Sequence, residues 1–319
     1  MSESRLSGQH VPVTIGEVLE LLDCRPGGIY ADCTLGGGGY AEAILERTAP
    51  DGIVVGLDWD AEAIARVRES LGARFGARLL LEQADFADIF EVLSRLRIER
   101  IDGIAADLGV SSYQLEDPER GFSFMHDGPL DMRMNRDLPL TAAGLVNTLP
   151  EKELADLIYR YGEERLSRRI ARAIVSIRRA HPFSRTRELS EVIVKAVPRA
   201  RGRSHIHPAT RTFQALRIAV NHELDSIERF LPEGLNVLKE GGRMCVVAFH
   251  SLEDRIVKVR FREWARPSRK MEEPASRGGE GEKPLVRLLT KKALRPGPDE
   301  VAKNPRARSA RVRAVEKLG

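Results

Sequence analysis

The chain has 319 residues, 42% of them hydrophobic, and a formal net charge of +4, which suits one large or two modest domains. No apolar run approaches the ~20 residues of a membrane span, and no apolar segment of the secretory type follows the N-terminus. The three cysteines, Cys24, Cys33 and Cys245, are isolated, which excludes a disulfide framework and a C-x-x-C metal site. We therefore expect a cytoplasmic protein that spans no membrane and binds no metal.

Acidic residues close three short apolar runs in the first third of the chain. Asp32, Asp58 and Asp107 end the runs, and a glycine loop at 36–39 follows the first. In an open parallel sheet, ligands bind at the carboxyl ends of the strands, and glycine lets the backbone approach them closely. The acid that ends the second strand can bind both hydroxyls of a ribose. The pattern predicts a site for an adenosine-containing cofactor.

The glycine loop is compatible with two cofactors. Gly36-x-Gly38-x-x-Ala41 fits the dinucleotide fingerprint, with Asp58 about 20 residues further on. A nicotinamide dinucleotide would place its pyrophosphate on the helix N-terminus, whereas S-adenosylmethionine carries a positive sulfonium. Asp32, just before the glycines, suits a positive ligand better. The residues favour S-adenosylmethionine, and a nicotinamide-dependent dehydrogenase or a tight turn without a ligand are the alternatives.

Residues 28–110 alternate between strand and helix patterns, which predicts a parallel α/β sheet. Helices are expected at Tyr40–Glu46 and after a cap at Asp60, and a third strand at Leu79–Leu81. The fourth strand is expected at Ile101–Ala106.

The alternation stops after residue 110. Apolar residues at helical spacing follow between Pro150 and Pro182, which predicts two helices. We expect a helical, basic insertion of roughly residues 118–214, which divides the α/β domain into residues 1–117 and 215–319.

The second part of the α/β domain is expected to begin with a long helix at Phe213–Leu231 that packs on the sheet. A fifth strand is expected at Arg243–Phe249, and a flexible loop at 265–284, which is rich in Pro, Gly and charge. A last pair of strands, at Leu285–Leu289 and Ala310–Val315, would form an antiparallel edge.

Positive charge is concentrated in one segment. Residues 160–217 contain 15 Arg and Lys and four Glu, a net charge of +11. This density indicates a polyanionic partner, most simply nucleic acid. The alternative is a solvated helix face with i,i+4 ion pairs, but four acids are too few to pair these bases. Aromatic residues make up only 5% of the chain, which argues against a base-stacking platform.

Seven sequence motifs carry a resemblance to a known family. They are Asp32-x-Thr34-Leu35-Gly36-x-Gly38-Gly39, Asp107-Leu108-Gly109-Val110-Ser111-Ser112-x-Gln114-Leu115, Arg120-Gly121-Phe122-Ser123-Phe124, Gly128-Pro129-Leu130-Asp131-Met132-Arg133-Met134, His207-Pro208-Ala209-Thr210-Arg211-Thr212-Phe213-Gln214-Ala215, Phe249-His250-Ser251-Leu252-Glu253-Asp254-Arg255 and Asn304-Pro305-Arg306-Ala307-Arg308-Ser309. The chain resembles, from His10 to Arg313, the bacterial 16S ribosomal RNA cytosine-N4 methyltransferases of the H type, a MraW-like family.

The resemblance implies an α/β fold: a Rossmann-like class I methyltransferase with a mostly parallel sheet, an antiparallel edge and an inserted all-helical domain. It implies S-adenosylmethionine-dependent N4-methylation of a cytidine in the decoding region of 16S rRNA of the small ribosomal subunit. Carried over residue by residue, the cofactor contacts fall on Gly38, Gly39, Tyr40, Asp58, Phe86, Asp107 and Gln114. Many members have His where this chain has Tyr40. If the backbone makes the family contact at this position, Tyr40 changes little, whereas a side-chain contact would be altered.

Methyl transfer to an amine needs in-line geometry and the loss of one proton, and positioning supplies most of the effect. Many amino-methyltransferases carry a (Asp/Asn/Ser)-Pro-Pro-aromatic tetrapeptide after the fourth strand, and Asp107-Leu108-Gly109-Val110 stands in its place here. Asp107 is therefore the first catalytic candidate, and His250 and Ser251 after the fifth strand are the second.

Further alternatives stay open. An rRNA-binding assembly factor without catalysis would not need Asp58, Asp107 and the glycines, all of which are present. The basic segment does not by itself separate an RNA substrate from DNA or protein. Neither the oligomeric state, a homodimer included, nor the choice between naked rRNA and the assembled subunit follows from the sequence.

Overall fold

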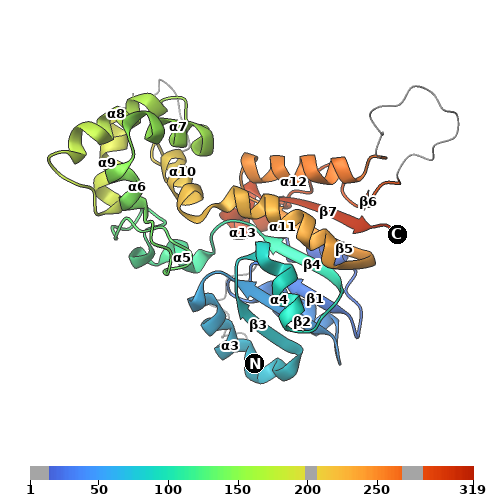
Figure 1. Cartoon of the computed structure of the whole chain (residues 1–319). Coiled ribbons are helices and arrows are strands. Elements are labelled where there is room, and N and C mark those ends of the chain that lie inside the picture. Colours follow the sequence, from blue (N-terminus) through green and yellow to red (C-terminus); the bar gives the residue numbers. More distant parts are fainter. Residues whose placement is uncertain (1–13, 198–206, 268–282) are drawn as a thin grey trace, which may run out of the picture. The chain divides into compact units, whose positions relative to one another are not determined.

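The computed structural model describes residues 14–197, 207–267 and 283–319. The chain forms two compact units (Figure 1). The sheet unit contains residues 1–109 and 224–319, and the helical unit contains residues 110–223. The insertion expected at 118–214 thus corresponds to a unit that begins eight residues earlier and ends nine residues later. Within the described part of the chain, no helix has the length and apolarity needed to cross a membrane.

A seven-stranded sheet forms the centre of the sheet unit, with the order β3-β2-β1-β4-β5-β7-β6. Its strands are β1 (Ile29–Asp32), β2 (Ile53–Asp58), β3 (Leu79–Gln83), β4 (Ile101–Asp107), β5 (Leu238–Ala248), β6 (Val286–Leu288) and β7 (Arg311–Lys317). The first five strands pair in parallel, and β7 runs antiparallel to both β5 and β6. The mostly parallel sheet with an antiparallel edge is confirmed. The chain reverses its winding direction between β1 and β4, and ligands bind at such a switch point.

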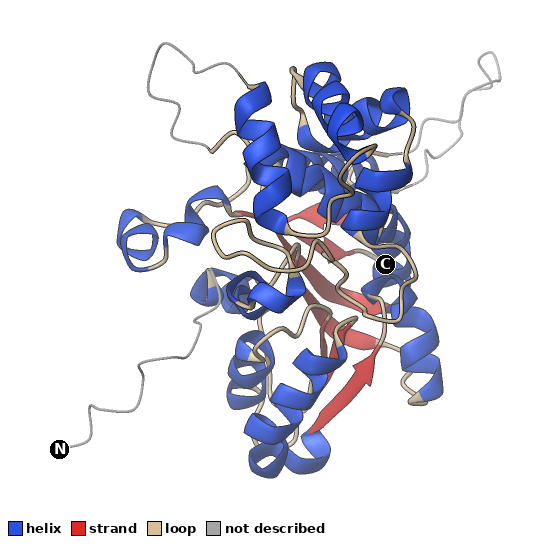
Figure 2. Cartoon of the chain, turned by 90° about the vertical axis from the view of Figure 1, so that its left-hand side faces the viewer, coloured by secondary structure: helices blue, strands red, loops and turns tan. Residues whose placement is uncertain are grey.

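Helices cover both faces of this sheet (Figure 2). One face carries α1 (Ile15–Leu22), α2 (Gly39–Arg47) and α3 (Ala61–Phe75), and the other carries α4 (Ile89–Arg95), α11 (Glu223–Val237) and α12 (Ser251–Trp264). A short helix, α13 (Pro298–Lys303), precedes β7. Along β4, Ile104 and Ala106 pack on the second face and Ala105 on the first, because successive side chains of a strand alternate.

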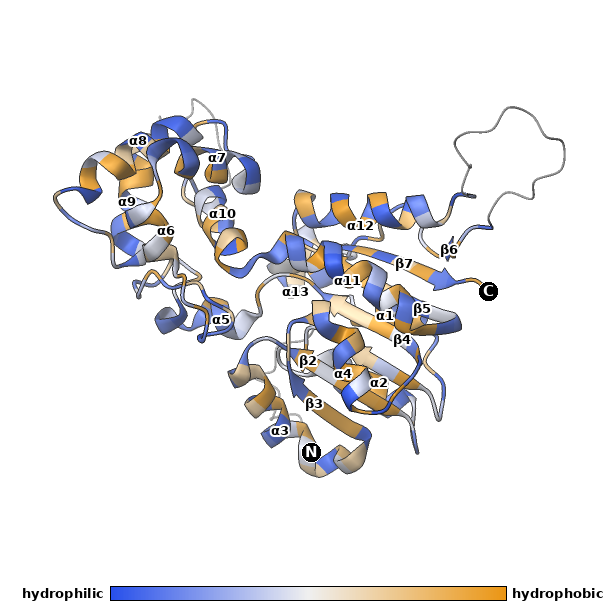
Figure 3. Cartoon of the chain, viewed as in Figure 1, coloured by the Kyte–Doolittle hydropathy of each residue, from blue (hydrophilic) through white to orange (hydrophobic). Residues whose placement is uncertain are grey.

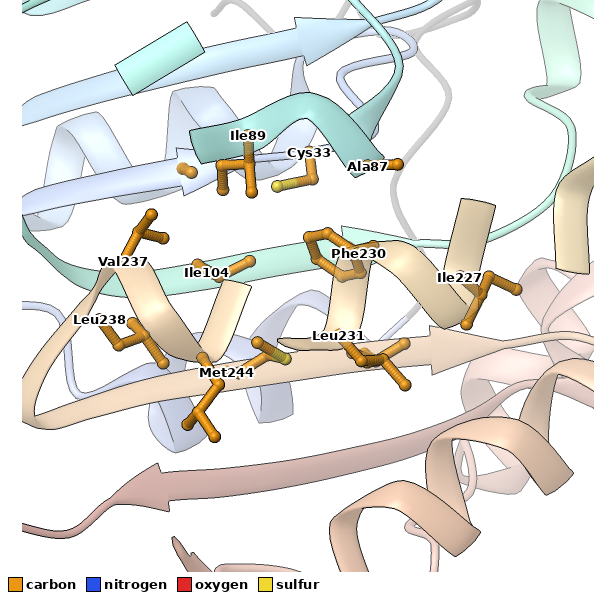
Figure 4. Packing of buried hydrophobic residues seen from close by; sticks show 14 of the residues in the cluster. Cys33, Ala87, Ile89, Ile104, Ile227, Phe230, Leu231, Val237, Leu238 and Met244 are labelled. Atoms are coloured by element: carbon orange, nitrogen blue, oxygen red, sulfur yellow. The ribbon is translucent and has the colours of Figure 1, made fainter. Parts of the chain in front are cut away.

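β1 and β2 are apolar up to the Asp that ends each strand, as expected for strands that are covered on both faces, whereas the helices are amphipathic (Figure 3). Phe230 and Leu231 of α11 are fully buried and point towards Ile104 of β4 and Met244 of β5 (Figure 4). Each such side chain contributes roughly 1.5–3 kcal/mol by leaving water. This packing fixes the sheet whose carboxyl ends carry the acidic residues.

The helical unit consists of α5 (Ser112–Glu116), α6 (Ala142–Thr148), α7 (Glu151–Gly162), α8 (Ser167–Arg178), α9 (Thr186–Ala196) and α10 (Thr210–Asn221). The two helices expected between Pro150 and Pro182 are α7 and α8. Leu154 and Ile158 of α7 pack against Ile170 and Ile174 of α8 in a core of its own. The helical unit thus has a hydrophobic core of its own.

The single long helix expected at Phe213–Leu231 is wrong. The chain forms α10 and α11, which are separated at His222, a residue with φ of 51°. Asn221 is buried at the end of α10, where its amide donates to Met132 O at 2.7 Å and its Oδ1 accepts from Met134 N at 2.7 Å. These tertiary hydrogen bonds hold the end of α10 within the helical unit, and hydrophobic spacing does not report them.

The remaining strand boundaries differ in detail. β5 begins at Leu238, five residues before the expected start, and its pairing with β4 is irregular near Gly241, which has φ of +75°. The last two strands form the expected antiparallel pair, β6 with β7. Most of the loop expected at 265–284 lies outside the described residues.

Candidate functional site

The glycine loop lies between the carboxyl end of β1 and the start of α2. Gly38 has φ of +83°, which favours glycine, and a Cβ there would lie only 3.0 Å from both Val67 and Leu71 of α3. The N–H of Leu35 donates to Leu57 O at 2.9 Å, which ties the loop to β2. The glycine loop therefore packs closely against α3 and is held at the carboxyl end of β2.

Asp58 organises the same loop from β2. Its Oδ2 accepts from the N–H of Gly36 at 2.8 Å, and its Oδ1 accepts from the N–H of Asp60 at 2.8 Å. Burial raises the pKa of Asp58 to about 6, against the effect of these two hydrogen bonds. Each oxygen keeps a second lone pair, so a pair of ribose hydroxyls can still donate to it. Asp60 in turn caps α3 by accepting from Glu62 N at 3.0 Å, as expected.

Asp32 is completely buried at the end of β1. It accepts hydrogen bonds from the backbone N–H groups of Thr34 at 3.3 Å and Ala41 at 3.0 Å. Burial raises the pKa of Asp32 to about 7, and the charge of Asp58 adds to the increase. Among the described residues, no Arg or Lys forms an ion pair with this carboxylate. A cationic ligand would supply the charge that the protein does not.

Asp107 ends β4, beside β1. Its N–H donates to Oγ1 of Thr34, and its carboxylate atom Oδ1 is buried without a hydrogen-bond partner in the described part of the chain. Burial raises the pKa of Asp107 well above its usual range, and the charges of Asp32 and Glu253 add to this. A buried acceptor without a donor is costly and rare in a folded protein. Asp107 therefore marks the place where a donor or a positive charge from a ligand fits.

Glu253 lies in the first turn of α12 and is completely buried. Its Oε2 accepts from the N–H groups of Phe249 and His250 at 2.8 and 3.1 Å, and the N–H of Glu253 donates to Nδ1 of His250 at 3.4 Å. This reciprocal cap fixes the His250 ring, whose Nε2 lies 3.0 Å from Oε1 of Glu253. His250 is thus the N-cap of α12, and Ser251 is its first residue.

The sequence analysis missed Glu253 as a neighbour of Asp107. The available signal was a Glu three residues after a polar cap residue, the spacing of a capping box. That spacing identifies a helix start. It does not show that the buried carboxylate faces the end of β4.

Phe86 and Tyr40 differ in their surroundings. The Phe86 ring contacts Phe230 edge to face, with centroids 5.1 Å apart, and stays partly exposed. The Tyr40 side chain is only 3% exposed and packs with α1 and α3. Burial raises the pKa of its hydroxyl well above the usual range, and the charge of Asp107 adds to this. Phe86 thus offers a ring for an adenine to pack on, whereas the Tyr40 side chain is part of the core.

Gln114 belongs to the helical unit. It is buried and completes a capping box at the start of α5: Ser111 N donates to its Oε1 at 3.0 Å, and its own N–H donates to Oγ of Ser111 at 3.2 Å. In the same unit His207 stacks on Phe124, with ring centroids 4.5 Å apart.

The basic residues of the helical unit divide into two groups. Arg178 is structural, because its guanidinium donates to the carbonyls of Val146 at 2.5 Å and Leu149 at 2.6 Å. Four other exposed arginines lie along α8 or at its ends: Arg165 precedes the helix, Arg169 and Arg172 lie within it, and Arg179 is its C-cap. We call these four residues the arginine face. Arg199, Arg201, Arg203 and His205 of the basic segment lie outside the described residues.

Acidic residues from outside the basic segment 160–217 also pair with its arginines. Arg168 pairs with Asp156 at 2.5 Å and Arg172 with Glu151 at 3.5 Å, both exposed pairs from α7 to α8. Arg165, Arg169 and Arg179 have no ion pair among the described residues. The arginine face thus keeps positive charge that no acid of the described chain neutralises.

Comparison with known proteins identifies the family. The sequence profile described as the MraW methylase family matches residues 7–318. A ribosomal RNA small subunit methyltransferase H from Syntrophobacter fumaroxidans is 60% identical over 311 residues, which cover 98% of this chain and 97% of that protein. Proteins of the same name from Geobacter sulfurreducens and Symbiobacterium thermophilum are 52% and 49% identical, over 97% of this chain and 99% and 96% of their own lengths. The glycine loop, the buried carboxylates and these matches agree: the chain belongs to the MraW methylase family, and its cofactor is S-adenosylmethionine.

Proposed function

We propose that this methyltransferase methylates N4 of a cytidine in the decoding region of 16S rRNA, within the small ribosomal subunit. The names of its relatives support rRNA of the small subunit as the substrate. The observation that carries the choice of an amine is the buried, unpartnered Oδ1 of Asp107 at the carboxyl end of β4. An exocyclic amine is a donor that this oxygen can accept from.

The cofactor supplies an electrophilic methyl group on its sulfonium when bound. Asp58 would hold the ribose hydroxyls, because it is fixed between the glycine loop and α3. Phe86 would pack on the adenine, while Gly38 and Gly39 let the backbone approach the ligand. The neighbouring carboxylate of Asp85 accepts from Ala87 N at 2.9 Å and from the Ser226 hydroxyl at 2.7 Å, which fixes its position next to Phe86.

Asp107 would orient the nucleophile. The lone pair of cytosine N4 is delocalised into the ring, which makes the amine a poor nucleophile. A carboxylate that accepts one N4–H would turn the lone pair towards the methyl group and stabilise the positive charge that develops on N4. That hydrogen bond strengthens in the transition state, so it accelerates transfer more than it strengthens binding. His250 and Ser251, at the start of α12, are the second candidates for contact with the base.

Methylation at carbon 5 of cytosine is the competing reaction. It needs a thiolate that adds to the ring, and reactive thiolates have lowered pKa values. Here burial raises the pKa of Cys24 to about 12 and raises those of Cys33 and Cys245 above the usual range. The chain has three cysteines, so no nucleophile of this kind is provided. The thiols favour attack by the amine itself.

The arginine face of α8 would hold the RNA backbone. Its side chains are exposed, and Arg165, Arg169 and Arg179 have no acidic partner among the described residues. Guanidinium groups bind phosphate oxygens strongly and without sequence preference, so base selection falls to other groups.

The test is methylation of small subunits and naked 16S rRNA from cells that lack this protein. Mass mapping of nuclease fragments locates the product, and chromatography of nucleosides separates N4-methylcytidine from 5-methylcytidine. We expect N4-methylcytidine at one position. Asp107→Asn should lower the single-turnover rate by about 10²-fold at saturating cofactor and RNA, whereas Asp88→Asn, at an exposed ion pair of the same unit, should not. A 5-methylcytidine product, or an Asp107→Asn rate equal to wild type, would contradict the proposal.

A further inference from the structure

The carboxylate pair, Asp32 and Asp107, ends two neighbouring strands, and Thr34 forms a hydrogen bond with each of the two residues. The N–H of Thr34 donates to Oδ1 of Asp32, and Oγ1 of Thr34 accepts from the N–H of Asp107. Their strands are hydrogen-bonded neighbours, with Asp32 opposite Ala105 and Asp107 two residues further on. Oδ1 of Asp107 is buried and receives no hydrogen bond from the described residues. Two buried carboxylates thus share one edge of the sheet.

Among the described residues, the titratable groups near this pair include no cation that acts on Asp32 or Asp107. From the strands and α2, the titratable neighbours are Cys33 after β1, Tyr40 of α2 and Asp58 of β2, with Asp60 and Arg66 next to Asp58. From α12, they are Glu253 and the adjacent His250. The single fixed cation of this set, Arg66, acts on Asp58. Like charges at close range disfavour ionisation of both members of a carboxylate pair, so such a pair titrates as one unit.

We propose that Asp32 and Asp107 share one proton, that binding of the sulfonium cofactor expels this proton, and that the amine substrate returns it during methyl transfer. The inference rests on the proposed function, because it takes these residues as the cofactor site and an amine as the methyl acceptor. The positive sulfonium replaces the proton as the charge that the pair needs.

The bonds and charges of the cycle balance. In the transfer step the sulfur–methyl bond breaks, and its electron pair stays on sulfur, which becomes a neutral thioether. The N4 lone pair forms the new nitrogen–carbon bond, and one N4–H proton passes to the Asp107 carboxylate. The pair then holds one proton beside a neutral product, as it does in the unliganded protein. The product therefore leaves without exchanging a proton with solvent.

This cycle lets the pair discriminate between S-adenosylmethionine and S-adenosylhomocysteine. At a pH where the pair would hold its proton, only the cationic cofactor gains from expelling it. As pH rises, the proton is lost anyway, and the affinity for S-adenosylmethionine should increase. The affinity for the neutral S-adenosylhomocysteine should stay constant or decrease, because two unneutralised carboxylates then face it. Burial raises the pKa of Asp32 to about 7 and raises that of Asp107 well above its usual range, so the pair holds a proton at a pH where an exposed Asp would not.

Isothermal titration calorimetry in buffers of different ionisation enthalpy counts the protons. At pH 6.5 we expect S-adenosylmethionine to release about one proton, and its dissociation constant to fall by up to about tenfold per pH unit between pH 5.5 and 7. S-adenosylhomocysteine should release none. Asp107→Asn and Asp32→Asn, each removing one member of the pair, should both abolish the release. The Asp88→Asn control should release the same number as wild type.

Three results would overturn the proton cycle: equal release with both ligands, no release with S-adenosylmethionine across pH 5.5–8, or full release in both pair variants. None of these three results depends on RNA, so they can be distinguished from a failure of the proposed reaction. A failure of the reaction would appear in the nucleoside analysis and would leave the calorimetry unchanged. Absence of binding by either ligand would instead remove the cofactor site, and the proton cycle with it.

Discussion

The carboxylate of Asp254 in α12 accepts a hydrogen bond of 2.7 Å from Nε of Arg313 in β7, and both side chains are at most 10% exposed. Nη1 of Arg311, two residues earlier on the same strand, lies 2.9 Å from the other oxygen of Asp254. Burial disfavours the charged carboxylate, but the two arginines outweigh this and lower the pKa of Asp254. The ion pairs join the first turn of α12, where His250 and Glu253 lie, to the antiparallel edge of the sheet. Arg311 and Arg313 therefore have a structural role at this edge.

Removal of Asp254 should destabilise the sheet unit strongly. Asp254→Ala leaves two arginines without a partner, one of them buried, and breaking a buried pair in this way costs about 3 kcal/mol. Urea denaturation at pH 7 measures this loss. Because the folded pKa is lowered, the contribution of Asp254 is present above its unfolded pKa and decreases as pH falls through the folded value, so the gap to wild type should narrow in acid. Asp88→Ala, which breaks the exposed pair with Arg229, should change stability by less than about 1 kcal/mol. Equal losses in both variants would contradict a buried clamp.

Asp32 should make the unliganded protein less stable as pH rises. Its pKa is raised to about 7 by burial, so the folded state holds a proton that the unfolded state has released. The stability associated with this proton is complete below the unfolded pKa and is lost progressively as pH rises towards 7, by about 1 kcal/mol per pH unit. Asp32→Asn should flatten the dependence of the unfolding free energy on pH between 5 and 7. The test compares the slope of unfolding free energy against pH and not its absolute value. Asn can accept a hydrogen bond from only one of the two N–H groups that Asp32 binds, so the variant is less stable at every pH. A slope identical to wild type would place the proton elsewhere.

Substitution of Asp58 should weaken cofactor binding more than substitution of its neighbour Asp60. Asp58→Ala removes the proposed ribose acceptor and frees the N–H of Gly36, and we expect a loss of ~2–3 kcal/mol, or roughly 30- to 150-fold, in affinity. Calorimetry with S-adenosylhomocysteine measures this without the sulfonium charge. Asp60→Ser keeps a capping side chain at the start of α3 and should change affinity little. A folded Asp58→Ala protein that binds with unchanged affinity would remove Asp58 from the site.

The arginine face of α8 should set the salt dependence of RNA binding. Replacing Arg165, Arg169 and Arg179 by Gln should reduce the slope of log K against log salt by about 2, at ~0.7 per phosphate contact with single-stranded RNA. Substitution of Arg229 and Arg262, exposed on helices of the sheet unit, is the matched control and should leave the slope unchanged. Arg178→Gln should instead lower thermal stability, because it frees the carbonyls of Val146 and Leu149. If the control variant flattens the slope as much, the RNA surface is not specific to α8.

The sequence by itself determined the sheet and its chemistry. Apolar runs that end in Asp32, Asp58 and Asp107 specify buried parallel strands, because a strand covered on both faces must be apolar until it reaches the edge. The glycine turn after β1 and the cap at Asp60 are local requirements of one turn and one helix start, so residues close in sequence revealed them. The family followed from motifs that are themselves strings of neighbouring residues.

Only the tertiary structure decided what these residues contact. Asn221 ends α10 through hydrogen bonds to residues almost 90 positions away, so the hydrophobic period that runs through it gave one helix instead of two. Glu253 faces Asp107, and Asp254 binds Arg313, because α12 folds back over β5 and β7. Burial also sets the charge state of the carboxylates, since the same Asp in water would simply be ionised. Hydrophobic spacing predicts which residues become buried. It does not predict contacts between residues distant in sequence or the electrostatic cost of burial, because both arise only when the chain has packed.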